Sequence, residues 1–199
     1  MNGPSRLLFL AGESGTGKST VGRSLEALAL LIYADLITKR AGPHYFPDRQ
    51  ENFCRWSLWT VELAQESNHE RLLSAFVQSM QERNGPSITD CKNLIIEGAV
   101  VGQPDFRKLI RSVLKIEYSV LFHDSEVATF WLDPPPRQVL DNVKARSRPQ
   151  ERGLTLERIE SRLTNYAAMM TAQSVPRFQS SASCYDAALS FLANGVIRT

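Results

Sequence analysis

The 199-residue sequence has few cysteines, no long hydrophobic run and almost no net charge. Its three cysteines, Cys54, Cys91 and Cys184, lie too far apart for a metal site or a disulfide framework, so a reducing cytosol is the expected compartment. No apolar stretch reaches the roughly 18 residues of a membrane-spanning helix, and the N-terminal residues do not follow the pattern of a signal peptide. A net charge of +2 favours neither nucleic acid nor a membrane surface as a partner.

The sequence also has no internal repeat, no low-complexity tract and no interdomain linker. Its length, with 43% hydrophobic residues, suits one domain with a sizeable core. We therefore predict a single domain over residues 1–199. The oligomeric state stays open, and a homodimer is one option.

The most informative stretch that is present is Gly12–Thr20, which reads GESGTGKST. It fits the phosphate-binding pattern G-x-x-x-x-G-K-[ST], and it lies between an expected buried strand, Arg6–Ala11, and an expected helix from Lys18. Glycines adopt backbone angles that let successive amide N–H groups point inward and surround a phosphate. The residues predicted to bind ATP are Gly12, Glu13, Ser14, Gly15, Thr16, Gly17, Lys18, Ser19 and Thr20.

Two side chains of this loop predict more specific chemistry. Lys18 offers a cation to the β- and γ-phosphates and is a candidate catalytic residue. The Ser19 hydroxyl is a candidate ligand of Mg²⁺. The loop therefore predicts ATP and Mg²⁺ as cofactors.

Two acidic residues lie at the ends of expected strands, at the edge where open α/β sheets bind ligands. Leu30–Ala34 is predicted as a strand before Asp35, with a helix continuing to Lys39 as the alternative. Asn93–Gly98 is predicted as a buried strand that contains Glu97 near its end. Either carboxylate is a candidate base for an acceptor hydroxyl, and Glu97 is also a candidate metal ligand. Which of them is the base stays open, and a simple cap is the alternative role for Asp35.

Three arginines, Arg146, Arg148 and Arg152, lie between two expected helices, and Gly153 breaks the segment. A guanidinium group is suited to binding two phosphate oxygens at once. We therefore predict a lid over about 146–154, in which Arg148 is a catalytic candidate and Arg146 and Arg152 bind the nucleotide. A solvated basic turn is the alternative.

The remaining segments predict an α/β fold, a doubly wound parallel sheet with helices on both faces. A strand is expected over Ala128–Asp133, and helices over about 137–146 and Thr155–Met170. The second helix is expected to be capped by Thr155 and to bury an apolar face that includes Tyr166. The segment 117–122 fits a helix or a strand, and 174–183 has the composition of turns.

Two further segments bear on the acceptor. Residues of about 36–90 are predicted to form an acceptor-side helical region, in which Trp56 and Trp59 either stack on a planar acceptor or belong to the core. Asp105 is predicted to cap a helix from about Phe106. Arg107, in the first turn of that helix, is either a phosphate ligand or an ordinary exposed arginine.

Several of these motifs resemble those of known kinases. Trp131–Pro136 with Arg146–Glu151 is similar to the strand, helix and arginine lid of deoxynucleoside and thymidylate kinases. Pro47-Asp48 with Arg55-Trp56-Ser57 is similar to the acceptor-side helix of deoxynucleoside kinases, whereas Glu97-Gly98 with Pro104 and Arg107 is closer to nucleoside monophosphate kinases. The chain departs from both kinase patterns directly after Glu97, where deoxynucleoside kinases have an arginine and thymidylate kinases have Asp-Arg-Tyr/Phe. Together with the loop, these motifs resemble a P-loop kinase of the nucleoside/nucleotide kinase superfamily.

This resemblance implies transfer of the γ-phosphoryl group of ATP to a small acceptor, a nucleoside or a nucleoside monophosphate. A hydroxyl of a sugar, an antibiotic or a modified base is the alternative acceptor, because the same fold serves many substrates. An NTPase switch is the alternative of a different class. The chain has no Asn-Lys-x-Asp motif, which a guanine-specific switch would carry.

Overall fold

The structure, a computed structural model, describes residues 5–34, 74, 78, 91–146, 151 and 153–194. Within these residues the chain forms a five-stranded sheet with the strand order β2-β3-β1-β4-β5. Every neighbouring pair of strands is parallel. The strands are β1 (Arg6–Ala11), β2 (Leu30–Tyr33), β3 (Asn93–Gly98), β4 (Glu126–Leu132) and β5 (Arg177–Phe178).

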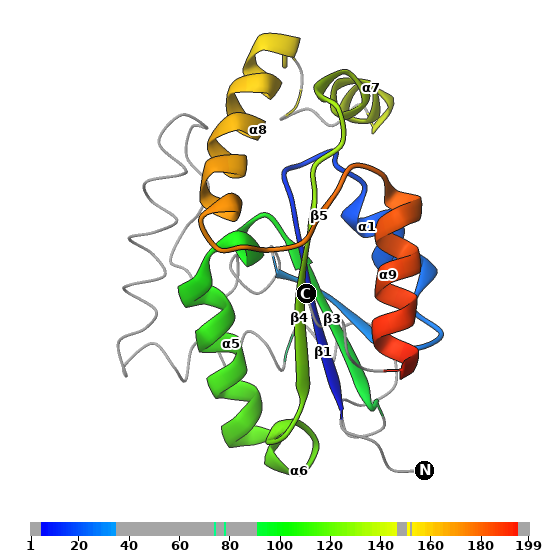
Figure 1. Ribbon diagram of the computed structural model, residues 1–199, viewed down its shortest axis with the longest axis vertical. Coiled ribbons are helices and arrows are strands. Elements are labelled where there is room, and N and C mark those ends of the chain that lie inside the picture. The colour runs from blue at the N-terminus through cyan, green and yellow to red at the C-terminus, as the bar shows by residue number, and fades with distance from the viewer. Residues whose placement is uncertain are drawn as a thin grey trace.

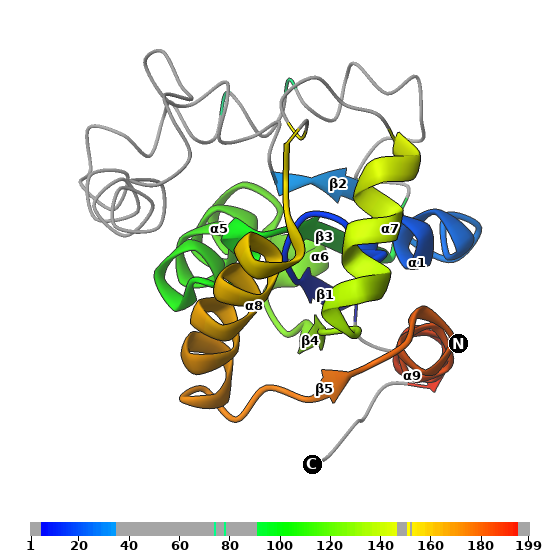
Figure 2. The same ribbon diagram turned by 90° about the horizontal axis from the view of Figure 1, so that it is seen from above.

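Helices cover both faces of this sheet. Figures 1 and 2 show α5 and α8 on one side of the sheet and α1 and α9 on the other, with α7 crossing above one end of the strands. The predicted α/β fold with a doubly wound parallel sheet is therefore confirmed. The helical segments are α1 (Lys18–Ser24), the 3₁₀ turn η2 (Val100–Gly102), α5 (Pro104–Glu117), α6 (Ser119–Phe122), α7 (Pro136–Arg146), α8 (Leu156–Thr171) and α9 (Ser181–Asn194).

The central strand β1 shows why this fold needs continuous apolar runs. Successive side chains of a strand point to opposite faces, so a strand covered on both faces is apolar at every position. Leu7 and Phe9 belong to the buried cluster that α5 covers, whereas Leu8 and Leu10 belong to the cluster that α1 and α9 cover. The apolar run of β1 ends at Ala11, where the loop begins at the carboxyl edge of the sheet. The buried clusters on both faces hold this strand in place and so fix the start of the loop.

Most predicted elements are confirmed, with small shifts of their ends. Leu30–Tyr33 is a strand, so the helical alternative is wrong there. Thr155 caps α8, because its side chain accepts a hydrogen bond from the Arg158 N–H at 3.4 Å. The segment 117–122, which fitted either a helix or a strand, continues α5 to Glu117 and then forms α6.

Two local predictions are wrong. Asp105 does not cap α5, because the helix begins at Pro104, one residue before Asp105, and so includes Asp105 in its first turn. Gln103 takes the N-cap position, and its side chain makes no capping hydrogen bond. Proline supplies the first-turn backbone angle there and needs no hydrogen-bond acceptor for a missing N–H. The segment 174–183 is irregular in part, as predicted, but the turn prediction is wrong for the short strand β5, which pairs with Trp131 and Leu132 of β4, and for the first residues of α9, which begins at Ser181.

Several predicted features lie outside the described residues. These are nearly all of the acceptor-side region of about 36–90 with Trp56 and Trp59, and Asp35, Arg148 and Arg152. Of the predicted lid, only Arg146, Glu151, Gly153 and Leu154 are described. Among the helices of the described ranges, none combines the length and apolar character needed to cross a membrane.

Candidate active site

The segment Gly12–Gly17 joins β1 to α1 at the carboxyl edge of the sheet. Gly15 has a φ of 90° and Gly17 a φ of 98°, which side-chain-bearing residues rarely adopt. A Cβ atom on Gly15 would stand 2.7 Å from Cγ2 of Val143, and one on Gly17 would collide with the Ser181 side chain. The loop is therefore packed closely between α7 and the start of α9, which the sequence pattern alone does not indicate.

Lys18 lies across the loop instead of extending into solvent. Its side-chain ammonium donates a hydrogen bond to the Glu13 carbonyl at 3.1 Å, and the Thr16 hydroxyl donates to the same carbonyl at 2.9 Å. Lys18 is buried, with 8% of its surface exposed. The predicted cation is thus held within the loop itself.

Ser19 and Glu97, the two predicted metal ligands, are in direct contact. The Ser19 hydroxyl donates to Oε1 of Glu97 at 2.8 Å. Parallel pairing of β1 with β3 places Glu97 beside Leu10, next to the loop. Glu97 is only 5% exposed, and its Oε2 has no hydrogen-bond partner among the described residues.

This pair fits a magnesium ion. A hydroxyl and a carboxylate are hard oxygen ligands, and a buried carboxylate oxygen without a partner is a group that a cation would satisfy. Mg²⁺ commonly takes only one or two protein side chains, together with water and substrate phosphates.

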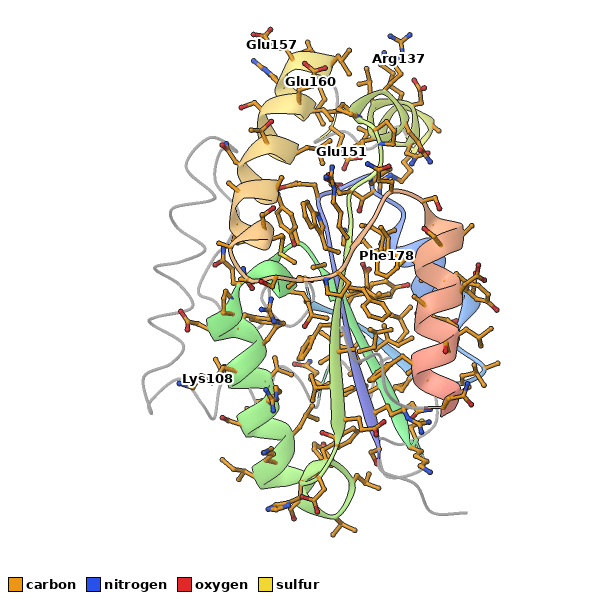
Figure 3. All side chains as sticks on the ribbon, in the orientation of Figure 1. Lys108, Arg137, Glu151, Glu157, Glu160 and Phe178 are labelled. Atoms are coloured by element: carbon orange, nitrogen blue, oxygen red, sulfur yellow. The ribbon has the colours of Figure 1, made fainter. Side chains whose placement is uncertain are left out.

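An acidic residue that the sequence analysis left without a role also contacts the loop. The Ser14 hydroxyl donates to Oε1 of Glu151 at 2.6 Å, and Glu151 is 9% exposed. Figure 3 shows Glu151 above the sheet, between α8 and α7. Its Oε2 lacks a partner within the described ranges. The loop therefore has one of the protein's own carboxylates beside it.

Arg146 reaches the same place from the end of α7. Its Nη2 lies 3.3 Å from the Ser14 hydroxyl and 3.6 Å from Oε1 of Glu151. The side chain of Asn142, on the same helix, donates to the Gly15 carbonyl at 2.8 Å and holds the helix on the loop. The structure thus places Arg146 at the predicted phosphate site, paired with an acid.

Tyr166 connects the loop to the turn after β3. Its hydroxyl accepts a hydrogen bond from the Gly12 N–H at 2.9 Å and donates one to the Ala99 carbonyl at 2.9 Å. Burial raises the pKa of Tyr166 well above its usual value, so the hydroxyl keeps its proton. The helical pattern correctly placed this residue on the buried face of α8, but periodicity carries no signal for the hydroxyl's partners.

Arg107 is half-buried and hydrogen-bonded, so the alternative of an ordinary exposed arginine is wrong. Its Nη1 donates to the carbonyls of Val101 at 2.7 Å and Gly102 at 3.0 Å, and its Nη2 donates to the side chain of Gln173. Burial lowers the pKa of this guanidinium from its usual value. Arg107 therefore braces the turn that follows β3.

Comparisons with known proteins add little to this geometry. No family model matches the chain, and no curated protein matches it. A shikimate kinase from Bacteroides thetaiotaomicron is similar at a TM-score of 0.48 and 13% identity, over 94% of this chain and 97% of that one. A deoxyadenosine kinase from M. mycoides has a TM-score of 0.46 and 14% identity, over 94% and 98% of the two chains. An uncharacterized protein from Eubacterium ventriosum has a TM-score of 0.46 and 10% identity over the same shares. At such low identities and TM-scores, we base the proposed function on the site alone.

Proposed function

We propose that this protein is an ATP-dependent kinase that transfers the γ-phosphoryl group to a small acceptor, a nucleoside or a nucleoside monophosphate. The observation that carries the proposal is the contact between Ser19 and Glu97 at 2.8 Å, directly after a glycine loop with a buried lysine. Each of these groups has a distinct task in phosphoryl transfer.

The loop from Gly12 to Thr20 holds the phosphates through its backbone N–H groups. Lys18 leaves the Glu13 carbonyl and pairs with the β- and γ-phosphate oxygens. Ser19 and Glu97 would hold Mg²⁺, which when bound offsets the negative charge on these phosphates. Positioning and charge neutralisation supply most of the catalysis in this class of reaction.

The transfer itself exchanges one bond for another. An oxygen of the acceptor forms a bond to the γ-phosphorus while the bond from that phosphorus to the bridging oxygen breaks, and ADP leaves with the electron pair. For a hydroxyl acceptor, a carboxylate takes the proton. We assign the metal to Glu97, which contacts Ser19 through Oε1 and whose buried Oε2 has no partner among the described residues, and the proton to Asp35, the other candidate base. Arg146, Arg148 and Arg152 stabilise the charge that develops on the transferring group.

A panel experiment tests this proposal. The protein is incubated with ATP, Mg²⁺ and one nucleoside, nucleoside monophosphate or other hydroxylated compound at a time, and the products are identified by mass. We expect one acceptor class to gain a phosphoryl group. Whether that acceptor already carried a phosphate separates the nucleoside branch from the nucleotide branch. Equal ATP hydrolysis with and without every acceptor would instead favour the NTPase switch.

Two variants locate the activity. Lys18→Ala removes the buried cation and is expected to lower turnover by about 100-fold or more, as loss of a charge-stabilising donor does. Lys108→Ala is the matched control, since this exposed lysine lies on α5, away from the loop (Figure 3). Full turnover by a folded Lys18→Ala protein would sink the proposal.

A further inference from the structure

One buried hydroxyl joins the ends of two neighbouring strands. Gly12 is the first residue after β1, and Ala99 is the first residue after β3. Tyr166, on α8, bonds to both: it accepts from the Gly12 N–H and donates to the Ala99 carbonyl, each at 2.9 Å. The phosphate loop and the strand that carries Glu97 are thus tied to each other through a third element.

The hydroxyl is not required for packing. A phenylalanine ring would fill nearly the same volume, yet only 2% of Tyr166 is exposed, so its hydroxyl must be desolvated to sit there. Its two hydrogen bonds offset this cost and satisfy two backbone groups of the site. A phenol hydroxyl is protonated at neutral pH, so it donates one hydrogen bond and accepts another at once.

The turn after β3 leaves room for this hydroxyl. A Cβ atom on Gly102 would collide with the Tyr166 hydroxyl and would stand 2.6 Å from Cε of Met169. The absent side chain at Gly102 therefore gives α8 its close approach. Arg107 also holds this turn, through the carbonyls of Val101 and Gly102.

We propose that Tyr166 is a positioning residue that sets the distance between the phosphate loop and the metal-binding carboxylate. The inference rests on the proposed function, because it concerns the same loop and the same Glu97. Ser19 and Glu97 come from two different elements and meet at 2.8 Å. A misplacement of about 1 Å in such a site can lower the rate by about 100-fold. Tyr166 limits that displacement through Gly12 on the loop and Ala99 two residues after Glu97.

Replacing Tyr166 by phenylalanine tests this role. We expect the dissociation constants of ADP and ATP in the presence of Mg²⁺ to rise about 10-fold, since two buried backbone groups lose their partner and the loop is no longer held. Binding of AMP, which has no β-phosphate for the loop to hold, is expected to change less than 2-fold. The Mg²⁺ concentration for half-maximal turnover should rise together with the KM for ATP.

Two other variants make the result decisive. Tyr185→Phe removes a phenol hydroxyl from half-buried Tyr185 of α9, on the opposite face of the sheet, and should leave ADP and Mg²⁺ dependence unchanged. Gly102→Ala displaces the Tyr166 hydroxyl without removing it, and is expected to weaken ADP binding to a similar extent. The double variant Gly102→Ala/Tyr166→Phe should then bind ADP no more weakly than the single variants do, because the two substitutions remove the same contact.

The outcomes separate this inference from the proposed function. If the wild-type protein binds neither ADP nor ATP, the proposed function fails. If the wild type binds both and Tyr166→Phe binds them equally well while unfolding at a lower denaturant concentration, the hydroxyl serves stability only and the inference is overturned. If Tyr166→Phe does not fold, Gly102→Ala decides: wild-type affinity for ADP would overturn the inference, and weakened affinity would support it.

Discussion

Replacing Ser19 by alanine removes the hydroxyl that joins the loop to β3. Ser19 donates to Oε1 of Glu97 at 2.8 Å, and Oε2 of Glu97 already lacks a partner in the described part of the chain. The substitution therefore leaves the carboxylate of Glu97, a residue that is only 5% exposed, without a hydrogen-bond partner on either oxygen among the described residues. It is expected to affect both the folding stability of the metal-free protein and its dependence on Mg²⁺.

The size of the stability effect follows from the burial of Glu97. A hydrogen bond to a charged group contributes about 1.5–3 kcal/mol, and leaving a buried polar group unsatisfied costs about 1–3 kcal/mol. These ranges describe the same loss, so we expect the free energy of unfolding to fall by about 2 kcal/mol. Ser19→Thr keeps the hydroxyl and should therefore retain most of the wild-type free energy of unfolding.

Urea unfolding without Mg²⁺, followed by circular dichroism, measures this difference. Ser24→Ala is the matched control, because Ser24 lies on the same helix, is exposed and donates to the Thr20 carbonyl within that helix. Its loss should change stability by less than about 0.5 kcal/mol. A double-mutant cycle with Glu97→Gln measures the coupling between the two side chains directly.

Function provides the second readout. With ATP and the acceptor found in the panel, Ser19→Ala should require much more Mg²⁺ for half-maximal turnover, whereas Ser24→Ala should match the wild type. Equal unfolding free energies for Ser19→Ala and Ser24→Ala, with no coupling to Glu97, would refute the contact on which the proposed function rests.

Three further predictions concern the surroundings of the loop. Glu151→Gln keeps the side-chain shape but removes a negative charge beside Ser14. Calorimetry should therefore show that this variant binds ADP several-fold more tightly than the control variant Glu157→Gln, which changes an exposed glutamate (Figure 3). Weaker binding by Glu151→Gln would show that the charge helps to hold the nucleotide. Gly15 has a φ of 90° and lies against Val143, so Gly15→Ala should lower the free energy of unfolding by about 2–4 kcal/mol. Gly153→Ala measures the backbone strain alone, because Gly153 has a φ of 80° and nothing lies within 4 Å of a Cβ atom there. An equal loss of unfolding free energy in the two variants would contradict close packing of α7 on the loop. Burial raises the pKa of Cys184 to about 12 from 9.0, so in the folded protein at pH 8 its thiol should be alkylated more slowly than that of half-buried Cys91, as followed by mass spectrometry. Because the folded state holds this proton more tightly, its contribution to stability is full below 9.0 and is lost as the pH rises toward about 12.

The sequence by itself determined the parts of the molecule that depend on local physics. An apolar run buried on both faces is recognisable from its residues alone, and the bounds predicted for β1 and β3 match the structure. The loop after β1 is recognisable because glycines at fixed spacings are needed for its backbone angles. Where local signals conflicted, as in 117–122, periodicity did not separate a helix from a strand, because the segment is short and apolar.

Only the tertiary structure decided which side chains meet. Ser19 and Glu97 are 78 residues apart, Ser14 and Glu151 are 137 apart, and Gly12 and Tyr166 are 154 apart. The sequence named Ser19 and Glu97 separately as metal ligands, but it assigned no role to Glu151 and treated Tyr166 only as a core residue. A periodic pattern tells which face of an element is buried and says nothing about what lies against that face. The partners are set by the order of the strands in the sheet and by the packing of α7 and α8 over their carboxyl ends, which are properties of the folded chain as a whole.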